Sequence, residues 1–574
     1  MQGDRALARE IQGEIEKATG KQVAVSMRDG IAGLHGHLPS HQAALEAGHL
    51  AGSSDKVREV VNDIVFPGKM RFKTARKVSE ELTGREFDAV IVGGGVIGLA
   101  VARELSQFNL SIALLERHND VGMDQTTHSN AMIHPAIQAK YGTLRWEMNY
   151  KGNRMWNEAA RQLDVDFKRV GTLIVAENPG EEALLPYAVS VAIKHNDPEP
   201  KLLDRAGLDR IEPGLAPNIR KGVLVWNTGI IGVFELLIAY AENALSNGVS
   251  IFLDTSVIGV QTEGFAIKAV DTTRGTVRTG LLINAAGLYA DRIAEFAGDR
   301  FFTIHPRKGE TIIFDKSYQP VRTVFAPVSI AAESQETRYT KGGGIIPTTD
   351  GNLQFGPTAM EVSDREDVST TAEGCDYLFD KFAPVLERLK PGYEKPDRSK
   401  IIARFAGCRA ATYKEDFIIE PSGKVRGLVH VAGIQSPGLA SAPAIAERVR
   451  EIIREERHPS VNDKFNPVRN RQVRFSKLGP KEQDRFIRAN PRFGHIVCRC
   501  ENVSEEEVVR ALHGDIPARS LDGVKRRTRA GQGRCQGGFC TPRIVEIASR
   551  EMNIGKEHLL KSEGKSYVLS GRTK

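Results

Sequence analysis

Two apolar runs separated by a glycine-rich segment give the clearest pattern in this chain. Residues 87–92 (FDAVIV) form a short apolar run, as a strand buried in a parallel sheet does. Residues 93–98 (GGGVIG) follow it, and residues 112–115 (IALL) form a second buried strand. This order predicts a strand, a glycine turn, a helix and a second strand, which together open an α/β unit with a parallel sheet.

The glycines of this turn have the spacing G-x-G-x-x-G. Gly93 permits the turn, Gly95 lets a pyrophosphate approach the backbone, and Gly98 lets the helix pack on the strand. The N-terminus of the helix supplies unpaired N–H groups and a positive dipole end to that pyrophosphate. Glu116 follows the second strand, 23 positions after Gly93, where a ribose-binding carboxylate belongs. We therefore predict a Rossmann-type dinucleotide-binding domain.

Two later segments return to this domain. Residues 279–291 (TGLLINAAGLYAD) are an apolar strand that ends in small residues up to Gly287, and residues 427–449 are a strand, a Gly/Pro-rich loop and a helix. Small residues at such junctions let backbone N–H groups reach a cofactor. Residues 305–315 and 342–359 lie between the two segments and have strand and turn patterns. They predict an inserted, β-rich substrate domain.

The first 68 residues have a pattern of their own. Residues 6–18 have helical periodicity, and residues 22–38 alternate around the turn Asp29-Gly30, which predicts a hairpin. Ser40 caps a second helix that runs to about Leu50, and residues 57–66 form a third strand. The pattern predicts a small αββαβ domain.

Four cysteines near the C-terminus predict a metal centre. They have the spacing C-x-C and then C-x4-C within about forty residues, which suits one tetrahedral or cluster site. Zinc is the alternative, but its usual pairs are C-x2-4-C. The spacing favours a [2Fe–2S] cluster, which carries one electron at a time. The predicted ligands are Cys498, Cys500, Cys535 and Cys540.

Composition fits a multidomain protein of 574 residues, because 41% hydrophobic and 26% charged residues are ordinary globular values. No run approaches the roughly 18 apolar residues of a membrane helix, and the N-terminus has no apolar secretion core. We expect a cytoplasmic chain. A net charge of +7 is modest, and no nucleic-acid partner is expected. A basic group in the cysteine domain should offset an anionic cluster or meet an acidic partner; it consists of Lys525, Arg526, Arg527 and Arg529.

Residues 87–450 resemble the glycine-oxidase/D-amino-acid-oxidase superfamily of FAD-dependent oxidoreductases. They look most like the group that includes glycerol-3-phosphate dehydrogenase and L-2-hydroxyglutarate oxidase. The strings that carry this resemblance are IVGGGVIGLAVARELS, HSNAMIHPAIQAKYGTLR, INAAGLYAD, PRKGE, IIPTTDGNLQFGPTA, FAGCRAA and AGIQSPGLASAPAIAE. The segment from Cys498 resembles the bacterioferritin-associated-ferredoxin type of [2Fe–2S] domain. Residues 1–68 resemble a BON domain, in which GLHGHLPS follows the Asp-Gly turn.

The resemblance implies FAD as the bound nucleotide. It puts the pyrophosphate on the three glycines of the turn and the adenosine ribose on Glu116. A loop beside the flavin and a later loop at its pyrimidine edge complete the expected site. The residues that the resemblance adds are Ser129, Asn130, Val257 on the adenine side, Gly287, Gly433, Pro437, Gly438 and Leu439.

The implied reaction is oxidation of a secondary alcohol in a small anionic substrate, by hydride transfer to FAD. The cluster would relay the electrons to a one-electron acceptor protein or a membrane quinone pathway. His134 matches a histidine near the flavin and is the expected base, with His128 as a weaker candidate. Arg409 matches the position that meets the substrate anion, and Arg307 and Lys308 could add charge.

Two other functions remain open from the sequence: a flavin-dependent amine or amino-acid oxidase on the same fold, and a non-catalytic electron carrier. The N-terminal domain is expected to contact a membrane surface or a protein, or else to be a cap packed on the enzyme, so the chain could sit at the periphery of the inner membrane. The fold class is therefore multidomain, α/β and α+β, with a small helical Fe–S domain at the C-terminus. The predicted boundaries are 1–68 (BON-like), 69–86 (linker), 87–455 (oxidoreductase), 456–494 (linker), 495–555 ([2Fe–2S]) and 556–574 (tail).

Overall fold

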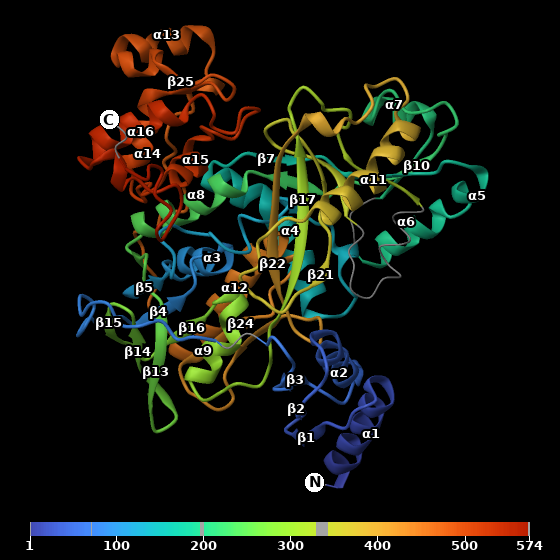
Figure 1. Ribbon diagram of the computed structural model, residues 1–574, viewed down its shortest axis with the longest axis vertical. Helices are drawn as coiled ribbons and strands as arrows, with labels where there is room; N and C mark the ends of the chain where they lie inside the picture. Colours follow the sequence, from blue (N-terminus) through green and yellow to red (C-terminus); the bar gives the residue numbers. More distant parts are fainter. Residues whose placement is uncertain (1, 70–71, 196–199, 329–342, 572–574) are drawn as a thin grey trace.

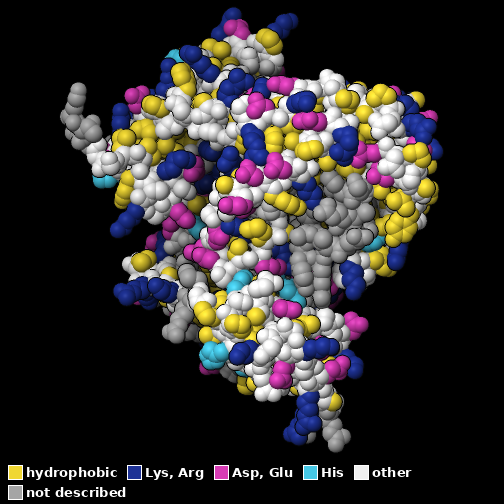
Figure 2. All heavy atoms as spheres, turned by 45° about the vertical axis from the view of Figure 1, so that its right-hand side comes forward, with side chains coloured by type: hydrophobic (Ala, Val, Ile, Leu, Met, Phe, Trp, Pro, Cys, Tyr) yellow, Lys and Arg dark blue, Asp and Glu magenta, His cyan; other side chains and the backbone are white. Residues whose placement is uncertain are grey.

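The computed structural model describes residues 2–69, 72–195, 200–328 and 343–571, so the ends of the first and last predicted segments, residues 1 and 572–574, lie outside it. The N-terminal domain lies at one end of the molecule and the cysteine-rich domain at the other, with the oxidoreductase part between them (Figure 1). On the face drawn in Figure 2, basic and acidic side chains are interspersed over the surface.

The N-terminal domain has the predicted αββαβ order. Its hairpin turns at Asp29 and Gly30, which have φ values of 52° and 76°, as a tight two-residue hairpin turn requires. The Ser40 side chain accepts a hydrogen bond from the Ala43 N–H and caps the second helix, as predicted. The elements are α1 (Gln2–Thr19), β1 (Ala24–Arg28), β2 (Ile31–His35), α2 (His41–Ser53) and β3 (Glu59–Asn62).

A mainly parallel sheet forms the nucleotide-binding domain and confirms the Rossmann-type prediction. Its order is β12-β5-β4-β16-β24-β23, and the pairing of Val90 with Leu282 brings together chain segments 192 residues apart. Helices α3 (Val96–Leu105), α8 (Val233–Ser246) and α12 (Gly438–Arg457) pack with the sheet in one apolar core. The strands are β4 (Ala89–Val92), β5 (Ile112–Leu115), β12 (Ser250–Phe252), β16 (Leu282–Asn284), β23 (Ile418–Pro421) and β24 (Leu428–Ala432).

A second sheet forms the inserted substrate domain. Its long strands β17 (His305–Phe314) and β22 (Ile401–Ala411) run antiparallel, and Arg307 lies directly opposite Arg409. Helix α11 (Ala372–Leu389) covers this sheet, and Phe382 packs on Phe355. The other strands are β8 (Thr172–Val175), β9 (Lys201–Leu203), β10 (Gly222–Val225), β18 (Val324–Pro327), β19 (Gly344–Pro347), β20 (Leu353–Gly356) and β21 (Met360–Glu361).

Smaller elements connect these sheets. One three-stranded sheet lies beside the nucleotide-binding sheet, and another contains the strand before the expected base. The first comprises β13 (Val257–Glu263), β14 (Ala266–Thr272) and β15 (Gly275–Arg278); the second comprises β6 (Met132–Ile133), β7 (Phe167–Arg169) and β11 (Gly229–Ile231). The remaining helices here are α4 (Leu144–Leu163), α5 (Pro179–Glu182), α6 (Leu185–Lys194), α7 (Arg205–Ile211) and α9 (Ala290–Phe296).

The cysteine-rich domain is small and mostly helical, as predicted. The stretch predicted to be a linker, residues 456–494, contains a helix, α13 (Pro480–Ala489). Its sequence is polar, but Phe486 packs against Phe493 at 5.3 Å between ring centroids, and this contact orders the helix. The other elements are β25 (Ile496–Cys498), β26 (Val503–Ser504), α14 (Glu505–His513), α15 (Leu521–Thr528) and α16 (Thr541–Met552).

The N-terminal domain packs on the substrate domain through α2. Gly48 and Gly52 lie against Tyr413, so closely that a Cβ at either position would overlap it. The Asn62 side chain donates a hydrogen bond to the Tyr413 hydroxyl at 2.9 Å. Within the described residues, no helix is long and apolar enough to cross a membrane.

Replacing Gly48 by alanine tests this packing. The Gly48→Ala Cβ must displace the Tyr413 ring, and overpacking of this kind costs about 1–3 kcal/mol. We expect a lower unfolding temperature and faster proteolytic cleavage in residues 72–81, which are exposed and join the two domains. The matched control is Gly13→Ala on α1, where nothing lies within 4 Å and helix propensity should raise stability by about 0.5–1 kcal/mol. Equal cleavage in both variants would show that the contact does not hold the domain.

Candidate functional site

A cavity of about 1160 Å³ lies between the nucleotide-binding sheet and the substrate sheet. Pockets for small molecules usually measure about 300–1,000 Å³, so this one has room for a large nucleotide and a small substrate together. Its wall includes the glycine turn, residues 122–130, part of β22 and residues 434–439. The N-terminal domain also contributes, through His49 and Gly52.

The glycine turn provides an open cradle at the N-terminus of α3. Gly93 has a φ of 109°, and a Cβ there would lie 2.5 Å from the Ala285 carbonyl oxygen. A Cβ on Gly98 would overlap the carbonyl of Gly93, so this glycine sets the approach of helix and strand. Gly95 lines the cavity, and a Cβ there would lie 3.4 Å from the Thr126 Oγ1. The turn thus fits a pyrophosphate bound by backbone N–H groups.

Glu116 lies beside this turn, at the end of β5. Its Oε2 accepts a hydrogen bond from the Gly94 N–H at 2.6 Å, and its Oε1 accepts one from the His118 N–H at 2.9 Å. Burial raises the pKa of this carboxyl. The carboxylate lines the cavity, where it could bind a ribose hydroxyl.

Most of the cofactor residues expected from the resemblance come together at the cavity. Helix α12 begins at Gly438, so the positive end of its dipole points toward this space. Three expected residues do not line the cavity: Gly98 packs helix on strand, Gly433 forms a turn with a φ of 67°, and Val257 begins β13. Those that line it are Ser129, Asn130, Gly287, Pro437, Gly438 and Leu439.

His134 lines the cavity at the end of β6. Two buried asparagines of α4 fix its backbone: Asn153 donates to the His134 carbonyl at 2.8 Å, and Asn149 donates to the Pro135 carbonyl at 3.0 Å. The His134 Nε2 lies 3.5 Å from the Ser436 Oγ. The imidazole thus stands next to the loop that precedes α12, where a substrate proton could reach it.

His128 also lines the cavity, but its ring is engaged by the backbone. Its Nδ1 lies 2.6 Å from the Asp124 carbonyl oxygen, so this nitrogen carries the proton and donates it. Gly407 leaves the space that the His128 side chain fills.

Arg409 is a cavity-lining guanidinium without a carboxylate partner among the described residues. It donates only to backbone carbonyls, those of Arg307 at 3.4 Å and Thr358 at 3.1 Å. Burial, and then the neighbouring Arg307 charge, lower the pKa of Arg409 to about 10, so it stays protonated at neutral pH. A guanidinium in this position can bind an anion with paired hydrogen bonds.

The other two expected cations are already neutralised. Arg307 donates to Glu361 at 2.6 Å and to Glu415 at 2.5 Å. Lys308 does not line the cavity, and its Nζ lies 2.7 Å from the Asp367 carboxylate. These carboxylates leave Arg409 as the better placed of the three for a substrate anion.

The four cysteines converge at the C-terminal domain. The Sγ atom of Cys500 lies 3.9 Å from that of Cys498 and 3.9 Å from that of Cys535. A zinc ion with bonds of about 2.3 Å would hold all its sulfurs about 3.8 Å apart. No three of these described sulfurs lie within 4.8 Å of one another, so Cys498 and Cys535 are farther apart. The spread fits a two-iron cluster, whose ligand pairs bind different iron atoms.

Backbone N–H groups point at two of these sulfurs, those of Cys498 and Cys535, whereas burial raises the pKa of Cys500 to about 11. A hydrogen bond from Cys540 and the N–H groups of Gly531 and Glu501 lower the pKa of Cys498 to about 5, against the effect of burial. The N–H groups of Phe539 and Gly537 lower the pKa of Cys535. Thiolates stabilised in this way are the form that binds iron.

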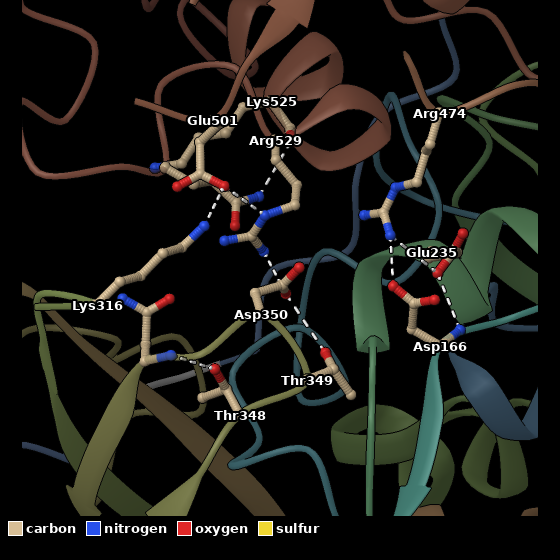
Figure 3. Close-up of polar contacts among 12 residues, drawn as sticks. Asp166, Glu235, Lys316, Thr348, Thr349, Asp350, Arg474, Glu501, Lys525 and Arg529 are labelled. Atoms are coloured by element: carbon tan, nitrogen blue, oxygen red, sulfur yellow. Dashed lines mark hydrogen bonds and ion pairs between the residues drawn. The ribbon is translucent and has the colours of Figure 1, made fainter. Parts of the chain in front are cut away.

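Ion pairs dock the cluster domain on the rest of the chain. Figure 3 shows Glu501, the residue after Cys500, between Lys316 at 2.8 Å and Arg529 at 2.9 Å, and Arg529 reaches on to Asp350 at 2.6 Å. Arg526 and Arg527 both pair with the buried Asp120. Carboxylates of this chain thus bind Arg526, Arg527 and Arg529, which leaves these three arginines less available to an acidic partner; their expected role in offsetting the cluster's charge stays a prediction.

Family models cover most of the chain. The model of the FAD-dependent oxidoreductase family matches residues 88–452. This chain belongs to that family. The BFD-like [2Fe–2S] binding domain matches residues 496–550 and the BON domain residues 3–68. The oxidoreductase thus carries the predicted FAD-binding fold and [2Fe–2S] domain, and the zinc alternative is not supported.

Known relatives agree with this family. The chain is 39% identical over 489 residues to a glycerol 3-phosphate dehydrogenase of Caloramator mitchellensis, covering 85% of this chain and 99% of that protein. It is 27% identical to the human mitochondrial L-2-hydroxyglutarate dehydrogenase, over 50% of this chain and 64% of that protein. The FAD-bound L-alpha-glycerophosphate oxidase of Mycoplasma pneumoniae superimposes with a TM-score of 0.59, at 27% identity, over 68% of this chain and 100% of that one.

The sequence did not reveal the part that the N-terminal domain plays at the cavity. His49 of α2 lies against His305 of β17, with 5.1 Å between ring centroids in an edge-on arrangement. Burial, and then His305, lower the pKa of His49 to about 4. The sequence predicted a helix that contains His49 but gave this histidine no role. His49 reaches the cavity because the N-terminal domain packs on the substrate domain, and no local sequence motif predicts this packing.

Replacing Cys535 by serine separates the two redox centres. Cys535→Ser removes an exposed ligand, so we expect loss of the cluster's iron and visible absorbance. FAD should stay bound, because the cofactor-lining residues of the cavity all lie before residue 440. Iron and flavin assays on the purified variant measure both. Retention of the full iron content would show that Cys535 is not a ligand.

Proposed function

We propose that this oxidoreductase oxidises the secondary alcohol of glycerol 3-phosphate to the corresponding ketone, and that the electrons leave through the [2Fe–2S] domain to a one-electron acceptor. When bound, FAD accepts the hydride from carbon, and the cluster passes electrons on singly. The chain's own residues bind the anion, hold the alcohol and take its proton.

The observation that carries this proposal is that Arg409 has no carboxylate partner among the residues that the structure describes. A half-buried guanidinium without a carboxylate is costly unless an anion binds it, and the cavity leaves space for one. Its cross-strand neighbour Arg307 is held by two carboxylates, so the two cations do not compete for the substrate. Lys140, Lys194 and Lys414 also line the cavity, where they offset part of the negative charge of its carboxylates.

His134 is the proposed base. As hydride leaves the carbon, the hydroxyl proton must go to an acceptor within hydrogen-bond reach, about 2.6–3.2 Å. Asn149 and Asn153 fix the backbone at His134 and Pro135, and the imidazole lines the cavity near Ser436. Neutral imidazole accepts a proton near neutral pH, where the reaction would run.

The relatives favour the phosphate over a dicarboxylate. Identity to the glycerol 3-phosphate dehydrogenase is 39% and spans 99% of that protein, whereas identity to the human L-2-hydroxyglutarate dehydrogenase is 27% over 64%. Of glycerol 3-phosphate and 2-hydroxyglutarate, we therefore propose glycerol 3-phosphate as the substrate.

We further propose that the N-terminal domain is a cap on the enzyme rather than a membrane module. Its His49 and Gly52 line the cavity, and its α2 helix is packed on Tyr413. Arg300 pairs with Asp63, and Arg58 pairs with Glu420, across the same interface. A domain held in this way shapes the entrance to the cavity.

Two substitutions separate binding from proton transfer. His134→Ala should lower kcat by about 10²–10⁴-fold with glycerol 3-phosphate, because the alcohol loses its base. Arg409→Ala should raise KM for glycerol 3-phosphate, with bound FAD retained, because the phosphate loses its guanidinium. Steady-state kinetics with an artificial acceptor measure both.

The matched control for the arginine is Arg404→Ala, an exposed position on the same strand β22 that does not line the cavity, and it should leave both constants unchanged. Parental kinetics for Arg409→Ala would refute the substrate assignment. Parental turnover for His134→Ala would give that histidine a structural role instead.

A further inference from the structure

The cluster reaches the surface at one edge of the C-terminal domain. Of the four ligands, Cys498 and Cys540 are buried, whereas Cys500 and Cys535 are exposed. Electron transfer slows steeply with distance, so electrons should leave the cluster on the side of the exposed pair. The residues around that edge therefore decide which acceptor can approach.

An aromatic ring lies at this edge, between two arginines. Phe539 precedes the ligand Cys540, and 46% of its surface is exposed. The guanidinium carbons of Arg499 and Arg543 lie 4.9 Å and 5.6 Å from its ring centroid. We call these three residues the Phe539 platform. Exposed aromatics and arginines are the side chains that contribute most to protein interfaces.

The two arginines keep their charge unpaired. Among the described residues, neither Arg499 nor Arg543 has an ion-pair partner; Arg543 has only a 3.5 Å contact with the Ile496 carbonyl. The other arginines of this domain behave differently. Arg526, Arg527 and Arg529 are bound by carboxylates of this chain, and Arg534 pairs with Asp315. The chain thus neutralises the cations that dock the domain and leaves two beside the exposed ligands.

We propose that the Phe539 platform is the docking surface for a one-electron carrier protein with an acidic face around its redox centre. The proposal rests on the electron relay of the proposed function. An acidic carrier would pair with Arg499 and Arg543 and bury the Phe539 ring, which brings its centre next to Cys500 and Cys535. One electron then passes from the reduced cluster to the oxidised carrier, and two such encounters remove the two electrons of one hydride.

Binding tests the proposal without depending on substrate turnover. The probe is plant plastocyanin, an acidic copper carrier, and the variant is Arg499→Gln/Arg543→Gln in the full-length protein. We expect the Kd for plastocyanin at low ionic strength to rise about tenfold, and the difference to shrink at 0.5 M salt, where charges are screened. The matched control is Lys481→Gln/Arg485→Gln on α13, two exposed cations of which Arg485 also lies over a ring, that of Phe486; it should bind like the parent.

Electron transfer gives a second readout. The enzyme is reduced chemically with limiting dithionite, so that an error in the substrate assignment does not affect the result. The parent should reduce plastocyanin faster than basic cytochrome c. In the Arg499→Gln/Arg543→Gln variant, called the platform variant, the rate of plastocyanin reduction should fall about tenfold, and the rate of cytochrome c reduction should not change. Phe539→Ser should lose affinity at both salt concentrations, because its contribution is apolar. Iron content and the visible spectrum must match the parent in every variant.

Three results would overturn the proposal. The platform variant could bind and reduce plastocyanin as the parent does. The loss could be equal in the α13 control, which would make it an effect of net charge. The parent could instead reduce quinone in phosphatidylcholine vesicles rapidly while all variants behave alike, which would make the membrane the electron acceptor. Failure of glycerol 3-phosphate to bleach the flavin would refute the proposed function and leave these outcomes unaffected.

Discussion

Two arginines that face each other across β17 and β22 organise the active cavity. Like charges placed directly opposite in a sheet repel, so at least one of them needs a counter-ion. Arg307 is bound by Glu361 and Glu415, and Glu415 in turn accepts a hydrogen bond from Gln435 in the loop before α12. Arg409, at the cavity wall, has no carboxylate partner within the described part of the chain. Because carboxylates neutralise Arg307 but not Arg409, Arg409 is the member of this cross-strand pair that can bind an anion.

The same network joins the parts of the chain. His305, two residues before Arg307, hydrogen-bonds Glu361 and packs against His49 of the N-terminal domain. At the other end of the molecule, Glu501, in the turn between β25 and β26, pairs with Lys316, just beyond β17. The Glu501 carboxylate is buried and would be left uncompensated without Lys316 and Arg529, so these pairs help to hold the cluster domain in place. The substrate strand β17 thus lies between both accessory domains.

Local patterns predicted most of the fold. The glycine turn, the apolar strands on either side of it, Glu116, the Asp29-Gly30 hairpin and the cysteine spacing each depend on residues close together in sequence. What the sequence could not predict depends on distant partners. Arg527 finds its counter-ion in Asp120, 407 residues away, and Lys308 finds Asp367. Helix α13 lies in a polar stretch, and its Phe486 packs against Phe493 beyond the helix. The charges of Arg527 and Lys308, which looked available from sequence, are therefore used inside the protein, whereas Arg409 has no carboxylate partner among the described residues.

Anaerobic reduction by glycerol 3-phosphate, followed in one sample by flavin absorbance and by electron paramagnetic resonance, tests the central claim most directly. The account predicts that substrate alone bleaches the flavin and that the signal of a reduced [2Fe–2S] cluster then appears in the same protein. Bleaching of the flavin with a cluster that stays oxidised would contradict the relay. A flavin that stays oxidised at millimolar substrate would contradict the assignment of the cavity.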